Sequence, residues 1–173
     1  LDGNAWTCVL HPCSMYNAIG IGPGIGKHAK TAEALHETLI ALQEENIPMV
    51  IDADALNLLA EHPEWSSLLP DNTILTPHPL EYHRLMDAGF DMERLILILK
   101  GHPTSICIPN STDTYTCPFG NNGMGTAGSG DVLTGIILGL LAQGYTPKDA
   151  AILGVSLHAI SGDIAASELG EHS

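Results

Sequence analysis

Residues 120–135 read GNNGMGTAGSGDVLTG, and the rest of the sequence is organised around this stretch. Five glycines fall within residues 120–130. Glycine tolerates positive φ and close backbone approach, so the loop can direct its N–H groups toward one point. The mostly apolar residues after Ser129 predict a helix, whose first turn has N–H groups without internal partners. A glycine loop that runs into a helix N-terminus is a favourable site for an anion such as phosphate.

One acidic side chain, Asp131, lies in the first turn of that predicted helix. A carboxylate beside a phosphate site indicates phosphoryl chemistry. The alternative interpretation is structural, with a glycine-rich turn and an aspartate that stabilises the helix N-terminus. This stretch alone leaves both interpretations open.

The composition bounds the kind of ligand. A chain of 173 residues with 45% hydrophobic content is long enough for one domain with its own core. The net charge is −14, and Lys and Arg together number six, which argues against a nucleic-acid surface. A phosphorylated ligand would therefore depend on backbone amides, a helix end, Mg²⁺ and very few lysines.

We predict a cytoplasmic protein that does not interact with membranes. No apolar run in the sequence approaches the length of a membrane span, and the first ten residues, LDGNAWTCVL, carry no export signal. The cysteines form no CxxC pair and have no zinc-binding spacing, so we expect free thiols in a reducing compartment. They are Cys8, Cys13, Cys107 and Cys117.

Strand-like and helix-like segments alternate along the chain. This alternation predicts an α/β fold with a mainly parallel central sheet and helices on both faces. The expected strands are residues 17–22, 48–52, 73–76 and 95–99, followed by a hairpin of residues 105–108 and 114–117. The expected helices are residues 31–46, 55–60, a segment from Leu80, residues 129–143 and a segment from Pro147.

Polar or glycine-rich clusters follow four of the expected strands: GPGIG, DADALN, TPHP and KG. Ligands of parallel sheets collect at the carboxyl ends of the strands, so we expect these clusters to meet at one edge. Residues 20–27, GIGPGIGK, match neither a P-loop nor GxGxxG, and predict either a tight turn or a close approach to a ligand.

Several side chains in these clusters have both a functional and a structural interpretation. Asp52 and Asp54 could hold a cation or a ribose hydroxyl, although a helix cap is the better interpretation for one of them. His78, between two prolines, is either aimed at a ligand or structural. Lys100 follows a buried strand and calls for an anionic partner. Apart from a role for His102, we expect the remaining histidines to be solvated or in the core.

Taken together, the motifs resemble those of the ADP- or ATP-dependent NAD(P)H-hydrate dehydratases of the ribokinase-like superfamily. Six blocks occur in the family's order, over about residues 17–170. They are GPGIG (22–26), IDADALNLLA (51–60), LTPHPLE (75–81), LKGHPT (99–104), GNNGMGTAGSGDVLTGIILGLLAQG (120–144) and HAISGD (158–163).

The resemblance implies a repair enzyme that restores hydrated NADH or NADPH, NAD(P)HX, to the normal cofactor and consumes a nucleotide phosphate. It implies Mg²⁺ and ADP or ATP as phosphate donor, and a homo-oligomeric state. Asp131 would be the catalytic base, and the amides of Gly128, Ser129 and Gly130 would form the anion hole. Gly24, His78 and Asp131 would contact the hydrated cofactor.

The resemblance also implies a set of nucleotide-binding residues in two segments. They are Lys100, Gly101, His102, Pro103 and Thr104, together with Asn121, Asn122, Gly123, Met124, Gly125, Thr126, Ala127, Gly128, Ser129 and Gly130.

Relative to the family, we expect residues 1–173 to form a single ribokinase-like domain that lacks N-terminal, internal and C-terminal segments. Residues 77–94 leave a short crossover between two strands, and His102-Pro103 replaces smaller residues. Two alternative functions stay open. One is a kinase of the same superfamily that phosphorylates a vitamin precursor or a sugar, and the other is a module that binds nucleotide without turnover.

Overall fold

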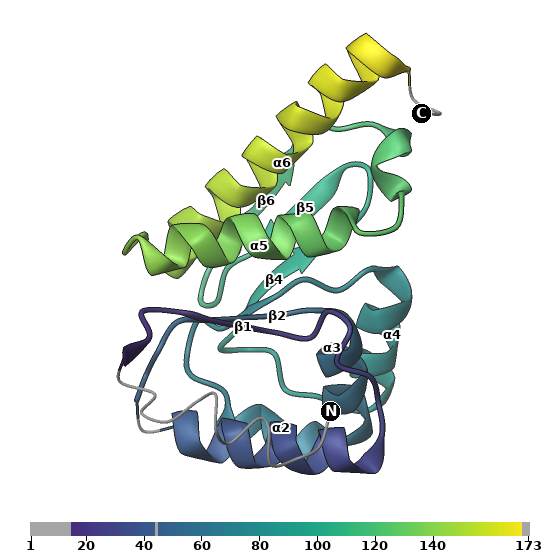
Figure 1. The fold of residues 1–173 in the computed structure, drawn as a ribbon. Coiled ribbons are helices and arrows are strands. Elements are labelled where there is room, and N and C mark those ends of the chain that lie inside the picture. The colour runs from purple at the N-terminus through teal and green to yellow at the C-terminus, as the bar shows by residue number, and fades with distance from the viewer. Residues whose placement is uncertain (1–14, 44, 171–173) are drawn as a thin grey trace.

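A six-stranded sheet separates two layers of helices in the computed structural model, which describes residues 15–43 and 45–170 (Figure 1). The spatial order of the strands equals their order in the chain. The strands are β1 (Ile19–Ile21), β2 (Met49–Ile51), β3 (Ile74–Leu75), β4 (Ile96–Leu99), β5 (Thr104–Cys107) and β6 (Thr114–Cys117). The α/β class is confirmed.

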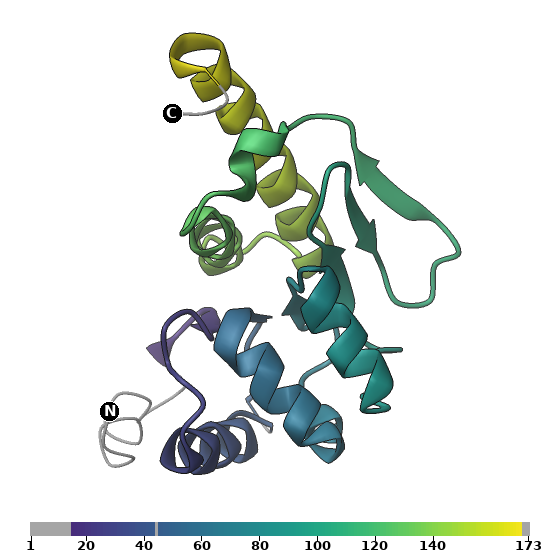
Figure 2. The same ribbon diagram turned by 90° about the vertical axis from the view of Figure 1, so that its right-hand side faces the viewer.

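The first four strands are parallel, and the last two pair antiparallel. In the parallel part, Val50 is the register partner of both Gly20 and Ile74. The hairpin of β5 and β6 extends the sheet beyond β4 and lies beside α6 (Figure 2). The predicted mainly parallel sheet and the predicted hairpin are therefore both correct.

The first helical layer comes from the connections between the parallel strands. It contains α2 (Ala29–Leu42), α3 (Ala53–Glu61), the 3₁₀ helix η2 (Pro63–Leu68) and α4 (Pro79–Asp87). Each crossover advances the sheet in the same direction, so right-handed connections place these helices on one face. Residues 77–94 include α4 and join parallel neighbours, so this short crossover is long enough.

The second layer consists of α5 (Ser129–Ala142) and α6 (Pro147–Leu169), which contact each other. Helix α5 packs on β1 and β2, while α6 packs on β4, β5 and β6. Alternate strand residues serve the two layers, since Ile51 belongs to the core under the first and Val50 to the core under the second. Helices therefore cover both faces, as predicted.

Helix α2 is shorter at its end than the predicted span of residues 31–46. Its buried residues are Thr31, Ala34, Leu35, Thr38, Leu39 and Leu42. The helix ends at Leu42, and Asn46 has a left-handed φ of 48°. The apolar stripe ends at Leu42 as well, so nothing beyond it stabilises a further turn against the core.

Five consecutive aliphatic residues at 95–99 predict a strand that is buried on both faces, but β4 is buried unevenly. Ile96 and Ile98 are fully buried, whereas Leu97 and Leu99 are half-buried. The side of β4 that faces the first layer is thus less completely covered than the side that faces α6.

The prediction that no apolar run approaches the length of a membrane span is wrong for helix α6. Within the residues that the structure describes, Pro147–Glu168 is long and apolar enough to cross a membrane by length and composition. The helix packs on α5 and on three strands, and 28% of this apolar stretch is buried.

The thiol prediction is tested in part. Cys107 is half-buried and Cys117 is buried, and both are free. Cys8 and Cys13 lie outside the described residues.

Candidate functional site

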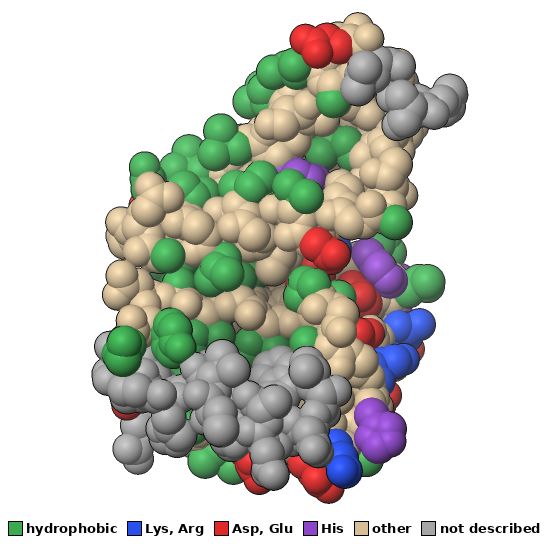
Figure 3. All heavy atoms as spheres, viewed as in Figure 1, with side chains coloured by type: hydrophobic (Ala, Val, Ile, Leu, Met, Phe, Trp, Pro, Cys, Tyr) green, Lys and Arg blue, Asp and Glu red, His purple; other side chains and the backbone are tan. Residues whose placement is uncertain are grey.

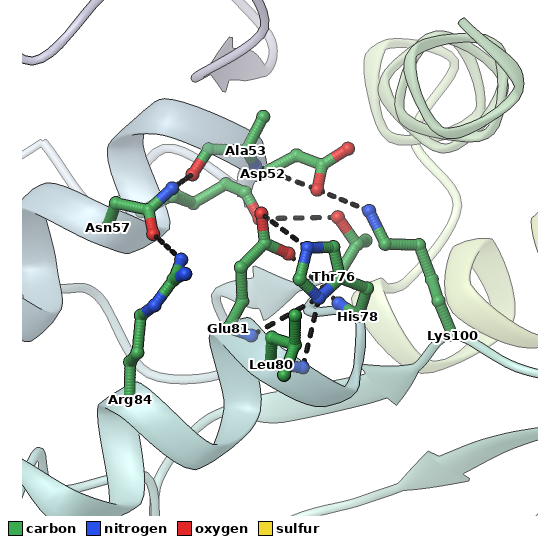
Figure 4. Close-up of polar contacts among 10 residues, drawn as sticks. Asp52, Ala53, Asn57, Thr76, His78, Leu80, Glu81, Arg84 and Lys100 are labelled. Atoms are coloured by element: carbon green, nitrogen blue, oxygen red, sulfur yellow. Dashed lines mark hydrogen bonds and ion pairs between the residues drawn. The ribbon is translucent and has the colours of Figure 1, made fainter. Parts of the chain in front are cut away.

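The polar clusters meet at the carboxyl edge of the parallel strands, as expected. Asp52 follows β2, His78 follows β3 by three residues, and Lys100 follows β4. Figure 4 shows these three residues on neighbouring elements, with Lys100 and Asp52 joined by a contact. Parallel pairing places the strand ends at one edge, which is why residues distant in sequence come together here.

Asp52 has a buried carboxylate that accepts hydrogen bonds from three donors. Its Oδ1 accepts from the backbone N–H of Ala53 at 2.8 Å and from Nζ of Lys100 at 2.6 Å. Its Oδ2 accepts from the hydroxyl of Thr134 on α5 at 2.8 Å. The Ala53 contact makes Asp52 the N-cap of α3, so the capping interpretation is confirmed for this residue.

The turn after β1 contacts residues 52–54, at the start of α3. Asp54 accepts a hydrogen bond from the N–H of Gly26 at 2.9 Å. Gly22 has a φ of +137°, and a Cβ there would lie 1.7 Å from the carbonyl oxygen of Asp52. No side chain fits at Gly22, so residues 22–26 make a tight turn against the backbone of Asp52, and a ligand approach at this turn stays a prediction.

Lys100 has the anionic partner that its position calls for. That partner is Asp52, and the Lys100 side chain is 21% exposed. The ammonium also lies against the N-terminus of α5, since a Cβ added at Gly130 would be 3.3 Å from Nζ. One lysine of a protein poor in cations thus faces the predicted anion hole.

His78 is the N-cap of α4, in a capping box. Its Nδ1 accepts from the N–H groups of Leu80 and Glu81 at 3.0 and 3.2 Å, and the Glu81 carboxylate accepts from the His78 N–H at 2.9 Å (Figure 4). Because Nδ1 is an acceptor, the ring hydrogen is on Nε2. Its Nε2 lies 3.7 Å from Oε1 of Glu81. The side chain is nevertheless 45% exposed and lines the cavity described below, so this structural role leaves part of the ring open to a ligand.

The glycine loop enters α5 as the sequence predicts. Gly128 is the N-cap residue, with a left-handed φ of 87° and no side-chain cap. The Ser129 N–H donates to the carbonyl of Thr126 at 3.2 Å, so this amide already has a partner. Among the hydrogen bonds of the described residues, none engages the N–H of Gly128 or Gly130. Asp131 is exposed in the first turn of α5.

A cavity of about 460 Å³ lies next to this helix N-terminus. The predicted nucleotide residues that line it are Lys100, Gly101, His102, Thr104, Asn121, Asn122, Met124, Gly125, Thr126, Ser129 and Gly130. His78 lines it as well. The structure thus brings most of the predicted residues around one space.

Six predicted residues are not part of the lining of this cavity: Gly24, Pro103, Gly123, Ala127, Gly128 and Asp131. Gly123 lines an adjacent cavity of about 320 Å³. Gly128 and Asp131 are the sequence neighbours of the lining residues Ser129 and Gly130, at the N-terminus of α5. Gly24 belongs to the turn after β1.

His158 on α6 was expected to be solvated or in the core, but it lines both cavities. Its Nε2 lies 3.2 Å from the hydroxyl oxygen of Ser129. Burial lowers the pKa of His158, a hydrogen bond with Ser129 opposes this, and the positive charge of Lys100 lowers it further. A neutral imidazole therefore faces the glycine loop.

Asp163, also on α6, anchors the start of the loop. Its carboxylate accepts from the N–H of Gly120 and from Nδ2 of Asn121, both at 2.9 Å. These two hydrogen bonds hold the pKa of Asp163 below its usual value. The signal in the sequence is two ionisable residues, His158 and Asp163, within a mostly apolar helix, where such groups need partners.

The donor set at this edge does not form a metal cage. Within residues 15–43 and 45–170, no three His, Cys, Asp or Glu side chains are grouped so as to hold a metal ion. Mg²⁺ commonly binds through one or two carboxylates together with substrate phosphates, so the residues present fit an ion that arrives with a nucleotide.

Comparison with known proteins now identifies the family. The sequence profile of the NAD(P)H-hydrate dehydratases matches residues 4–172. The chain belongs to this family. It is 39% identical to the ADP-dependent (S)-NAD(P)H-hydrate dehydratase of Neisseria meningitidis serogroup B, over 89% of this chain and 57% of that protein. It is also 39% identical to the bifunctional NAD(P)H-hydrate repair enzyme of Moorella thermoacetica, and the match covers 100% of this chain and 35% of that protein.

Solved structures agree with this assignment. The ADP/ATP-dependent NAD(P)H-hydrate dehydratase of Bacillus subtilis, co-crystallised with ATP/Mg²⁺, superposes with a TM-score of 0.72 at 30% identity, over 91% of this chain and 58% of that one. Arabidopsis thaliana ribokinase superposes with a TM-score of 0.54 over 85% of this chain and 50% of its own. At 13% identity that likeness shows the ribokinase-like fold alone.

The chain spans between about a third and three fifths of the length of these family members.

Proposed function

We propose that the protein restores hydrated NADH or NADPH to NAD(P)H and consumes ADP or ATP in the process. Membership of the NAD(P)H-hydrate dehydratase family supports this reaction. The observation that carries the proposal is local: the N-terminus of α5, with its glycine loop, meets the ammonium of Lys100 at Gly130. A helix N-terminus and a lysine that converge beside a cavity suit a transferring phosphoryl group.

In this proposal, Asp131 takes the proton from the hydroxyl on the hydrated ring. The hydroxyl oxygen then forms a bond to the terminal phosphorus of the nucleotide, whose own P–O bond breaks. The ring nitrogen next pushes the phosphate out as an anion, which leaves an iminium ion on the ring. Loss of a proton from the adjacent ring carbon to water then restores the double bond. Gly128 and Gly130 supply amides for the developing charge, and Ser129 contributes if its contact with Thr126 opens.

The proposed ligand contacts divide between two sides of the edge. Lys100 to Thr104 and Asn121 to Gly130 hold the phosphate donor, while Gly24, His78 and Asp131 contact the hydrated cofactor. When bound together with the phosphate donor, Mg²⁺ would supply positive charge that neutralises the phosphates. That the Bacillus relative was crystallised with ATP/Mg²⁺ supports this choice of donor and ion. Cytoplasmic location, homo-oligomerisation and the lack of nucleic-acid or membrane partners remain predictions.

The direct test incubates the full-length protein with hydrated NADH, ADP or ATP, and Mg²⁺, and follows the recovery of NADH absorbance. We expect recovery with release of phosphate. A stable phosphorylated product from another alcohol would instead favour a kinase of the same superfamily. Nucleotide binding with no phosphate release would indicate a binding module.

The role of Asp131 has its own test. Removal of a catalytic carboxylate base costs about 10² to 10⁴ in rate, so Asp131→Asn should lose turnover by that factor and still bind nucleotide. Asp149→Asn is the matched control, because Asp149 is an exposed aspartate in the first turn of the other helix, α6. Near-normal turnover in Asp131→Asn would remove Asp131 from the mechanism.

A further inference from the structure

Asp52 makes more contacts than a helix cap requires. It is 1% exposed, and its three donors come from the start of α3, from the end of β4 and from α5. A buried carboxylate is costly unless it is paired and hydrogen-bonded. The site thus contains a fully buried negative charge for which the proposed chemistry has assigned no role.

Two of the three contacts do not need that charge. Asparagine caps helices about as well as aspartate, so the contact with the Ala53 N–H requires only an oxygen acceptor. The hydroxyl of Thr134 likewise needs only an acceptor. The contact that needs a carboxylate is the one with the Lys100 ammonium, at 2.6 Å.

The position of the Lys100 ammonium affects both its ion pair with Asp52 and the N-terminus of α5. Its Nζ faces both Asp52 and the Gly130 position at the N-terminus of α5, and its side chain lines the cavity. A lysine side chain is a flexible four-carbon stem that ends in a point charge. Without a fixed partner, the ammonium would sample several positions, and misplacement by about 1 Å is enough to cost catalysis.

We infer that Asp52 is a positioning residue that acts through Lys100: it holds the ammonium at the N-terminus of α5, where the transferring phosphoryl group passes. This inference rests on the proposed function for the identity of that group. Asp52 itself touches neither the donor nor the hydrated cofactor. Its charge orients the lysine, and the lysine stabilises the negative charge that develops on the phosphoryl oxygens.

The test uses the full-length protein with Asp52→Asn, Lys100→Met and the double variant. Asp52→Asn retains the helix cap and removes one negative charge from the phosphate site, so the Kd for ADP with Mg²⁺ should stay the same or decrease. Its kcat should fall by about 10²-fold, because the ammonium is no longer held in place. Lys100→Met should raise the Kd and lower kcat. The double variant should have the kcat of Lys100→Met alone.

The matched control is Asp71→Asn, which breaks the exposed ion pair of Asp71 with Arg94 away from the site. Its kcat and Kd should equal those of the wild type. If Asp52→Asn does not fold, Asp52→Glu keeps the charge but moves the carboxylate by one methylene. We expect the same loss of kcat with donor binding retained.

Two results would overturn the inference. One is a kcat for Asp52→Asn close to the wild-type value. The other is an Asp52→Asn loss of the same size in the Lys100→Met background, which would mean that Asp52 acts on folding and not through the lysine.

A second readout separates this inference from the proposed function. The ³¹P resonance of the terminal phosphate of bound ADP should shift in the same direction in Asp52→Asn and in Lys100→Met. If the wild type binds ADP but restores no NADH, the proposed reaction fails, while this common shift still supports the link between Asp52 and Lys100. Absence of the common shift, or of any ADP binding by the wild type, overturns the inference.

Discussion

The two helical layers of the protein differ in what they expose. In the first layer, α2 buries one apolar stripe and places Glu33 and Glu37 on its exposed side, with Ile40 as an exposed large apolar residue. Helix α4 of the same layer exposes Leu80 and Met86. In the second, α5 and α6 expose large apolar side chains as well as burying others, and hydrophobic side chains follow both helices in Figure 3. The exposed ones are Val132, Leu153, Leu157, Ile160 and Ile164.

The difference separates a helix that buries a single stripe from helices that are apolar on more than one side. Helix α2 has the amphipathic pattern of a helix between core and solvent. The second carries the glycine loop, Asp131, His158 and Asp163, and its helices are apolar on more than one side. Helical periodicity therefore identifies the inner face of α2 but not that of α6.

The largest expected stability effect contrasts the two layers directly. Leu39→Ala on α2 removes a fully buried side chain from the core, and should lower the free energy of unfolding by about 2–5 kcal/mol. Urea-induced unfolding followed by circular dichroism measures the loss.

Leu157→Ala on α6 is the matched control, because this leucine is 50% exposed. Its unfolding free energy should change by no more than about 0.5 kcal/mol. A loss in Leu157→Ala as large as that in Leu39→Ala would contradict the contrast, and would show that the outer face of α6 is covered in the full-length protein.

An intermediate effect is expected at the turn where the first layer meets the site. Gly22→Ala places a Cβ against the carbonyl oxygen of Asp52, and such overpacking costs about 1–3 kcal/mol, to which the strain of positive φ adds. Thermal unfolding should show a lower Tm.

Gly24→Ala serves as the comparison for Gly22→Ala. Gly24 also has a positive φ, of +69°, but a Cβ there meets nothing within 4 Å. Its loss of stability should be the smaller of the two. Equal losses would mean that backbone strain, and not contact with Asp52, decides the need for glycine at position 22.

The smallest effect concerns pH and belongs to the second layer. Burial lowers the pKa of His158 in the folded protein, so the unfolded chain takes up a proton first as the pH falls below the ordinary value of 6.5. His158 therefore lowers stability as the pH falls from 6.5 through its folded pKa, and has no such effect above 6.5. The slope of the unfolding free energy against pH is at most that of one proton, and the partial exposure of His158 to solvent reduces it.

Urea unfolding at a series of pH values measures this slope. His158→Gln should have a flatter dependence of stability on pH between 6.5 and the folded pKa than the wild type. Identical slopes for the two proteins would show that His158 does not titrate differently in the folded and unfolded states.

Local patterns were enough to predict much of the fold. The apolar stripe of α2, the polar turn between β5 and β6, and the Thr146-Pro147 start of α6 each lie within one short segment. The six ordered blocks also indicated the family and most of the residues that line the cavity. The exact end of α2 and the incomplete burial of Leu97 and Leu99 could not be predicted, because packing against other elements decides both.

The glycine loop shows the same division at the site. The sequence by itself determined that residues 120–135 form a loop leading into a helix with Asp131 in its first turn, because glycine spacing and helix capping are local effects. Only the tertiary structure decided the partners of that loop. Lys100 reaches it from β4, Asp52 from β2, and His158 and Asp163 from α6. Such contacts depend on how the sheet orders its strands and where α6 packs, and no short segment contains that information.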